Sequence, residues 1–155
     1  MAAAQQNVYN ATDLLNMVGD SIGVSRWHEI DQQLINDFGR ITKDEQWIHV
    51  DEEAAAAGPF GCTIAHGFLT LSLLSALMAE AFKVDGAKMV LNYGLDRVRY
   101  PAPVLVGQRI RAQVSVGDAQ EIPNGVHVVF HVIVERDGED RPGCVADSVA
   151  RYLFA

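Results

Sequence analysis

The distribution of apolar and polar residues divides the chain into a first half with helical segments and a second half with the period of β-strands. After Gly86, apolar and polar residues alternate and β-branched residues are frequent, which is typical of half-buried strands. Turn-forming residues such as Pro123-Asn124-Gly125 separate these segments. The pattern therefore predicts four strands, at 88–100, 108–118, 126–136 and 144–154.

The longest predicted helix covers residues 67–82 and is apolar nearly all the way round, with a single charge, Glu80, close to its end. A helix of this kind is normally buried in a core. We therefore expect an α+β fold in which an antiparallel sheet wraps around this helix. Shorter elements should precede it: a helix at 12–18, a strand at 21–30, a helix capped by Asp31 and ending at Gly39, an extended segment at Trp47–Asp51 and a short helix at 52–57.

The chain shows no internal repeat and no linker rich in Pro or Ser, and its 155 residues are enough for one continuous core. We expect a flexible tail at residues 1–10 and one domain at 11–155. The two cysteines, Cys62 and Cys144, make no disulfide framework. The first residues lack the pattern of a secretory signal, and the longest apolar stretch is too short to span a bilayer. These features predict a cytoplasmic protein without a membrane partner.

The charge of the chain is −8, which disfavours a nucleic acid or an anionic membrane as partner. The charge is unevenly distributed, because six of the twelve basic residues lie between Lys83 and Arg111, where the only acidic residues are Asp85 and Asp96. That segment therefore carries +4 and the rest of the chain −12. A small polyanionic ligand and a set of solvated charges on strand faces are both consistent with this pattern.

One candidate for chemistry is the pair Asp44 and His49 in KDEQWIHVD. A carboxylate and an imidazole that reach the same water molecule form an acid–base pair, since one can accept a proton while the other supplies one. The spacing brings the two together only if the chain turns near Glu45-Gln46. The alternative is a surface Asp and a partly buried His without catalytic roles.

A second candidate is the segment GPFGCTIAHGF (58–68), in which His66-Gly67 opens the apolar helix. The first N–H groups of a helix have no acceptor within it and lie at the positive end of its dipole. Because glycine lets a ligand approach closely, the Gly67 N–H could stabilise an oxyanion. Alternatively, Gly67 relieves crowding between helix and sheet and His66 is a plain cap.

Other kinds of site are disfavoured. The closely spaced ligand pairs typical of zinc sites are missing, although four potential ligands occur near one another in the chain: His49, Asp51, Cys62 and His66. We therefore expect no metal. The sequence also lacks the G-x-S-x-G motif of serine hydrolases and the glycine-rich loops that bind phosphates.

Taken together, DEQWIHVDEEAAAAGPFGCTIAHGFLTLSLL (44–74) and NYGLDRVRYPAPVLVG (92–107) resemble the MaoC-like dehydratase family, the (R)-specific enoyl-CoA hydratases of the hot-dog superfamily. The resemblance extends from about residue 12 to the end. It implies a hot-dog domain whose sheet surrounds the helix 67–82. It also implies a homodimer with its active site near the interface between the subunits.

The resemblance further implies hydration of trans-2-enoyl-CoA thioesters to (R)-3-hydroxyacyl-CoA. Asp44 and His49 match the catalytic Asp and His of the family, and Gly67 matches its thioester-binding backbone amide. His66 precedes that glycine and is a candidate substrate-binding residue. Gln46 stands where members carry Asn or Gln and is expected to support the loop.

No cofactor is expected, apart from coenzyme A as part of the substrate. The coenzyme A phosphates would account for the basic segment, with Arg97 and Arg99 as first candidates. One departure from the family is Lys43, which stands where Gly is common; if that position has a positive φ, Lys43 is mildly strained. Three alternatives remain open: a dehydratase acting on acyl-carrier-protein substrates, a thioesterase using a carboxylate of the helix (Glu80) and a non-catalytic subunit that binds acyl thioesters.

Overall fold

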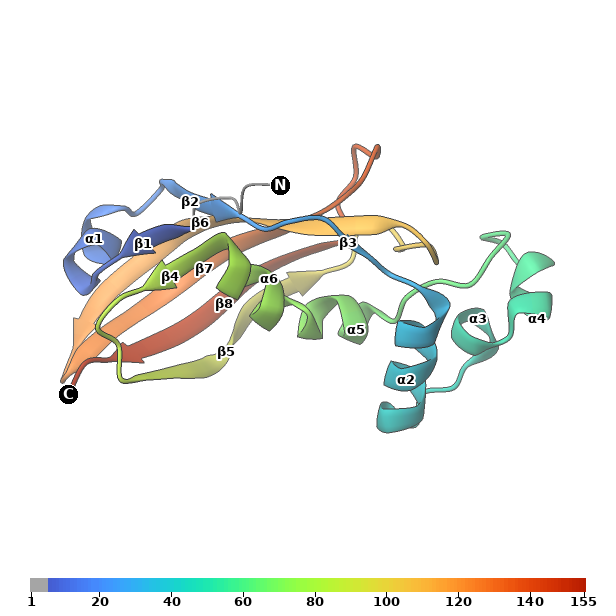
Figure 1. Ribbon diagram of the computed structural model, residues 1–155, viewed down its shortest axis with the longest axis horizontal. Helices are drawn as coiled ribbons and strands as arrows, with labels where there is room; N and C mark the ends of the chain where they lie inside the picture. Colours follow the sequence, from blue (N-terminus) through green and yellow to red (C-terminus); the bar gives the residue numbers. More distant parts are fainter. Residues whose placement is uncertain (1–5) are drawn as a thin grey trace.

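The four strands expected from the alternating pattern are confirmed and form most of one curved antiparallel sheet (Figure 1). They are β5 (Met89–Arg99), β6 (Arg109–Ile122), β7 (Gly125–Arg136) and β8 (Cys144–Leu153). Two short strands, β2 (Ser21–Val24) and β3 (His28–Glu29), stand where one strand was expected, and both pair with β6. The computed structural model describes residues 6–155 and has the strand order β2-β6-β7-β8-β5, which leaves β5 at an edge.

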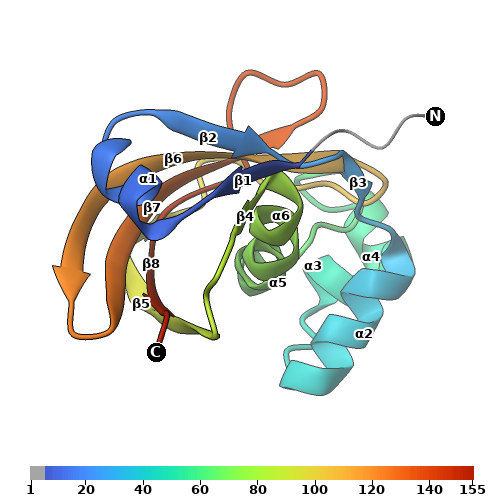
Figure 2. The same cartoon turned by 60° about the vertical axis from the view of Figure 1, so that its left-hand side comes forward.

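The concave face of the sheet surrounds two helices, α5 (Gly67–Ser72) and α6 (Leu74–Ala81), as Figure 2 shows. The expectation of an apolar core helix surrounded by an antiparallel sheet is confirmed, but the expectation of one continuous helix at 67–82 is wrong. The helix breaks at Leu73, and the chain leaves it at Phe82. Ser72 precedes the break and its hydroxyl donates to the Phe68 carbonyl oxygen, but serines also occur within continuous helices, so the pattern did not reveal the break. The helix is also not buried all round, since Phe68 is 70% exposed.

The end of α6 lies directly against β2. A Cβ atom at Gly23 would be 2.1 Å from the Ala81 carbonyl oxygen, so only glycine fits at this crossing. One residue earlier, the Glu80 carboxylate accepts hydrogen bonds from the Arg26 guanidinium and from His28 Nε2, both at 2.8 Å. These ion pairs hold the chain between β2 and β3 to the helix and lower the pKa of Glu80 to about 2.

The last part of the expected tail forms a strand. β1 (Asn7–Tyr9) pairs in parallel with β4 (Phe82–Val84), so the expectation of a tail at residues 1–10 is wrong at residues 7–9. Residues 1–5 lie outside the described part of the chain. The next helix, α1 (Ala11–Asn16), begins one residue earlier and ends two residues earlier than expected.

Three helices lie beyond one end of the sheet: α2 (Gln32–Thr42), α3 (Trp47–Val50) and α4 (Glu52–Ala56) (Figure 1). Asp31 caps α2 as expected, but the helix continues through Gly39 for three more residues. The extended segment expected at Trp47–Asp51 is wrong, because residues 47–50 form a single helical turn. A turn of four residues is too short to show helical periodicity. Within residues 6–155, no helix has the length and apolar character needed to cross a membrane.

Candidate active site

Asp44 is presented by a tight turn at the end of α2. Lys43 adopts the left-handed conformation, with a φ of 63°, which is the condition under which mild strain was expected at this position. This turn at Lys43 lies two residues earlier than Glu45-Gln46, where we expected it. The Asp44 backbone N–H then donates to the Gly39 carbonyl oxygen at 3.1 Å, while its side chain is exposed.

His49 lies on α3 and is buried. Its Nδ1 is 2.7 Å from the Ile64 carbonyl oxygen. Because a carbonyl oxygen only accepts hydrogen bonds, Nδ1 carries the proton and Nε2 of the neutral ring is left as an acceptor. Burial lowers the pKa of His49, although the hydrogen bond to Ile64 opposes this shift. The imidazole is therefore neutral at neutral pH and can accept a proton at Nε2.

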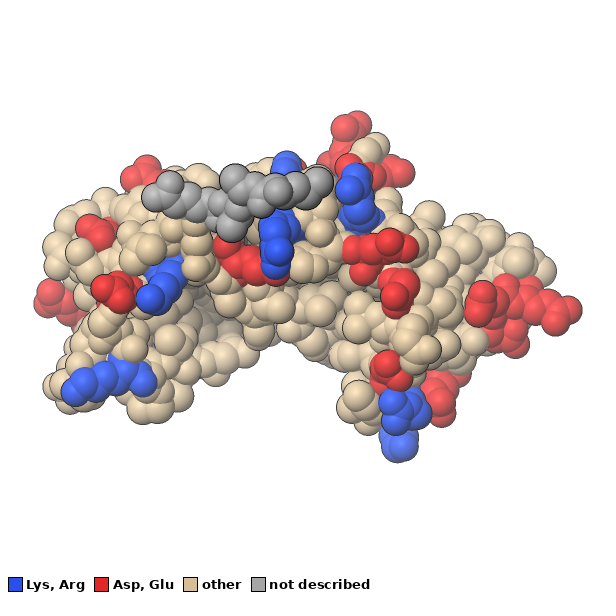
Figure 3. Space-filling view, in the orientation of Figure 1, with Lys and Arg blue, Asp and Glu red and all other residues tan. Residues whose placement is uncertain are grey.

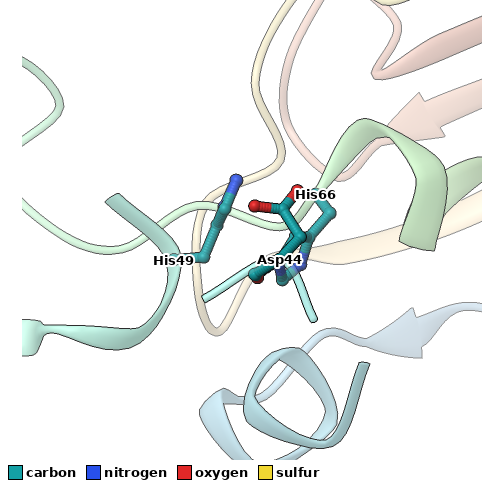
Figure 4. Close-up of side chains that lie close together, drawn as sticks. All are labelled: Asp44, His49 and His66. Carbon is teal, nitrogen blue, oxygen red and sulfur yellow. The ribbon is translucent and has the colours of Figure 1, made fainter. Parts of the chain in front are cut away.

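The fold brings Asp44, His49 and His66 together, and one ligand atom from each lies within 4.8 Å of those of the other two (Figure 4). The His49 ring stacks on the His66 ring, with 3.8 Å between centroids and 26° between planes. Figure 4 shows that the Asp44 carboxylate lies beside both imidazole rings. A water molecule near this carboxylate and Nε2 of His49 would have two groups able to exchange protons with it.

Beside His49 lies a pocket of about 300 Å³, whose walls include Gly67, Thr70 and Tyr100. Gly67 is the first residue of α5, so its N–H has no acceptor within the helix. A Cβ atom at Gly67 would lie 3.0 to 3.1 Å from three carbons of the Tyr100 ring. Close packing against Tyr100 therefore favours glycine here, in line with one of the two explanations from the sequence. Because Gly67 also lines the pocket, the other explanation stays open, namely that its backbone N–H stabilises an oxyanion.

The three clustered side chains do not make a good metal site. His66 Nε2 donates to the Asp44 carbonyl oxygen, and His66 Nδ1 is fully buried without a partner. Because the Nδ1 lone pair of His66 is fully buried, the accessible ligand atoms are the Asp44 carboxylate and Nε2 of His49, whereas catalytic zinc sites have three protein ligands. Of the four ligands considered from the sequence, Asp51 caps α4, and neither it nor Cys62 belongs to the cluster within residues 6–155. The arrangement suits acid–base chemistry better than metal binding.

The basic segment is largely neutralised by acidic residues from other parts of the chain. Arg97 Nε donates to Asp147 Oδ2 at 2.8 Å, and Asp147 also accepts from His131. Further ion pairs on the sheet join Arg109 to Asp137 and Arg111 to Glu135. Figure 3 likewise shows basic and acidic groups interspersed over one face of the molecule. These residues therefore do not form a continuous basic strip. The alternative from the sequence, a set of solvated charges on strand faces, fits most of them.

Two further expected site residues have few contacts. Arg99 is exposed and donates to the Val98 carbonyl oxygen, so it is the less constrained of the two candidate arginines. The Gln46 side chain is exposed and makes no capping hydrogen bond, although its backbone oxygen accepts from the N–H of His49 and begins α3.

Residues 13–137 match the protein family described as MaoC like domain. The chain belongs to the MaoC-like dehydratase family. Among curated MaoC relatives, 3-hydroxyacyl-thioester dehydratase Z of Mycobacterium tuberculosis is 48% identical over 145 residues, which cover 93% of this chain and 96% of the relative. Nodulation protein N of Rhizobium leguminosarum is 44% identical over 145 residues, with 92% and 90% covered.

Solved structures agree on the fold. The (R)-hydratase from A. caviae involved in PHA biosynthesis matches with a TM-score of 0.69 and 21% identity, covering 83% of this chain and 94% of that one. This likeness shows the MaoC-like hot-dog fold. The family membership indicates an enzyme of the lyase type that adds or removes water.

Two contributors to the site had no recognisable signal in the sequence. Gln32 of α2 donates to the His49 carbonyl oxygen at 2.8 Å and accepts a hydrogen bond from Thr63, and so ties α3 to the chain before α5. Tyr100, which follows β5, forms a wall of the pocket. Both contacts join segments that lie more than fifteen residues apart, which spacing arguments do not reach.

Proposed function

We propose that this protein catalyses the reversible addition of water to trans-2-enoyl-CoA thioesters to give (R)-3-hydroxyacyl-CoA, with Asp44 and His49 as its acid–base pair. The observation that carries the proposal is that ligand atoms of these two side chains lie within 4.8 Å of each other, and that His49 lines a pocket together with Gly67. The names of the relatives, which include 3-hydroxyacyl-thioester dehydratases, agree with this class of reaction.

The proposed reaction starts with a water molecule held by the Asp44 carboxylate and by Nε2 of His49. His49 accepts a proton from the water while the water oxygen bonds to C3 of the substrate. The electrons of the C2–C3 double bond move towards the thioester, whose oxygen gains negative charge. A proton from the pair is then delivered to C2, so the product gains one H and one OH and both side chains return to their starting states.

Gly67 and the burial of His49 both support this reaction. An N–H group in the first turn of a helix can stabilise charge on the thioester oxygen, which is the role proposed for Gly67. His49 serves as a base only while its imidazole is neutral. Because burial lowers its pKa, it keeps this form to a lower pH than an exposed histidine would. The imidazolium formed during the reaction lies beside the Asp44 carboxylate, which favours its positive charge.

Coenzyme A is the proposed carrier, and Arg99 is the better candidate for contacting its phosphates, because Arg97 is already paired with Asp147. No further cofactor is needed for this chemistry. Comparing crotonyl-CoA with crotonyl-pantetheine tests the carrier: we expect a lower KM for the coenzyme A thioester, and equal KM values would contradict this part of the proposal.

We also propose that the protein is a homodimer that associates through β5. This strand is at the edge of the sheet, and all but two of its eleven residues are exposed. The exposed residues include five large apolar side chains: Met89, Val90, Leu91, Tyr93 and Leu95. An edge strand with this composition is open to pairing with another chain, and a second copy would extend the sheet symmetrically.

The experiment for the acid–base pair uses two near-isosteric substitutions, Asp44→Asn and His49→Gln. Each should lower kcat for hydration of crotonyl-CoA by roughly 10²–10⁴-fold, the contribution of positioned acid–base groups. Asp118→Asn and His127→Gln, on the sheet, are matched controls that should leave kcat unchanged. Chiral analysis of the product tests the (R) configuration. Near-normal activity in either site variant, with correct folding, would refute the assignment.

A further inference from the structure

His66 is buried, with 2% of its surface exposed, but does not play the role of a helix cap. It precedes the first residue of α5, yet its side chain makes no capping hydrogen bond. Its Nδ1 has no hydrogen-bond partner within the described chain. Burying a polar ring with an unsatisfied atom costs free energy, so helix capping does not explain why histidine occupies this position.

The other ring nitrogen makes one strong contact. Nε2 of His66 lies 2.8 Å from the backbone carbonyl oxygen of Asp44. Since the carbonyl only accepts, Nε2 carries the proton and the unpartnered Nδ1 is a lone pair. The N–H of Asp44 is bonded to Gly39, so hydrogen bonds hold the backbone of Asp44 at both its N–H and its carbonyl group. The hydrogen bond from His66 holds the residue directly after Lys43. It therefore stabilises a turn in which the left-handed conformation of Lys43 costs free energy.

The face of the same ring supports His49. The two imidazoles stack at 3.8 Å, and the Phe38 ring packs against His66 with 5.1 Å between centroids. The edge of the His49 ring is fixed separately, by the bond from Nδ1 to Ile64. One buried side chain thus contacts both members of the proposed pair, the backbone of one and the ring of the other.

We infer that His66 is a positioning residue, which holds the Asp44 turn with its Nε2–H and supports the His49 ring with its face. The inference deepens the proposed function and rests on it. It replaces the expectation that His66 binds substrate, because neither ring nitrogen is available to a substrate. Nε2 is hydrogen-bonded to Asp44, and Nδ1 is buried.

Two substitutions separate the two contacts. His66→Phe keeps an aromatic face against His49 and removes the donor to Asp44, while His66→Gln keeps an N–H donor of similar reach and removes the ring. If the donor positions Asp44, His66→Phe should lower kcat by on the order of 10-fold, the worth of one hydrogen bond, with KM unchanged. His66→Gln should keep kcat within about 3-fold of the wild type. His127→Phe, on the outer face of the sheet, is the matched control.

Full activity in His66→Phe would overturn the inference. A larger loss in His66→Gln than in His66→Phe would do so as well, because it would show that the aromatic ring matters and that the donor to Asp44 does not. A measurement on the wild-type protein decides the matter even if a variant fails to fold. Long-range ¹H–¹⁵N spectra report which nitrogen of each histidine carries the proton.

We expect the Nε2–H form for His66 and the Nδ1–H form for His49. The Nδ1–H form at His66 would remove the bond to Asp44 and refute the inference. This result is independent of catalysis, so a wild-type protein without hydratase activity would refute the proposed function while the spectra still test the hydrogen bond of His66.

Discussion

Replacing Gly67 by alanine tests whether its backbone amide faces the reacting thioester. The new Cβ atom would lie 3.0 to 3.1 Å from the Tyr100 ring, whereas carbon atoms are most stable at about 3.5–4.0 Å apart. The ring therefore has to move by about half an ångström. Tyr100 is 42% exposed, so it can move without disturbing the core.

The expected change in stability is small, because two effects oppose each other. Displacing the ring costs contacts worth about 1 kcal/mol or less, and alanine is favoured over glycine in a helix by up to about 1 kcal/mol, with less at a terminus. The methyl group, however, projects next to the N–H that is proposed to bind the thioester oxygen. We expect kcat/KM to fall on the order of 10²-fold, the loss seen when one oxyanion donor is removed.

The assay pairs thermal unfolding with hydration of crotonyl-CoA on the same sample. Tyr100→Ala is combined with Gly67→Ala in a double-mutant cycle. If the displaced ring blocks the pocket, the double variant should recover activity relative to Gly67→Ala. If the methyl group itself keeps the thioester from the amide, it should not. Gly117→Ala, with a 3.2 Å contact on the sheet, is the control. Full activity in Gly67→Ala would refute the assignment of Gly67.

Two predictions concern the fold and the assembly. The pKa of Glu80 is lowered to about 2 from its ordinary 4.5, so its ion pairs stabilise the protein above pH 4.5 and lose this effect as the pH falls towards 2. Glu80→Gln should lower the free energy of unfolding by about 1 kcal/mol at pH 7, since the pairs are partly exposed, and by much less at pH 2; equal losses in denaturant titrations at both values would contradict this. Leu91→Glu should convert a dimer of twice 16.9 kDa to monomer in light scattering, while Ile41→Glu, on α2, should not. A monomeric wild type would refute the proposed interface.

The sequence predicted the sheet well because its strands are long and alternate. In β7, every second residue from Val126 to Arg136 is buried, which is the signal that a period of two provides. Short elements gave no such signal. The turn at Trp47–Val50 was taken as extended, and β1 was missed because its partner Phe82–Val84 lies more than seventy residues away.

The site was predicted in its members and only partly in their roles. Asp44, His49 and Gly67 could be named because motifs in their neighbourhood resemble those of a known family, and the structure brings the first two together beside the pocket of the third. The contact of His66 with Asp44 depends on the left-handed turn at Lys43, and pattern reasoning does not give it. Counting charges along the chain suggested a basic segment at 83–111. In the fold, Arg97 and Arg111 are paired with acidic residues of strands that are remote in sequence.

The site helices α2 and α3 lie beyond one end of the sheet, and the core of the protein lies within its curve (Figure 1). This separation has an evolutionary consequence. Substitutions at the exposed residues of the site segments that take no part in the proposed chemistry, 45–47 and 59–61, alter few of the contacts that stabilise the sheet, and effects at separated sites are close to additive. New substrate preferences can therefore arise in these segments with little loss of stability. Libraries for directed evolution of this enzyme are best confined to them.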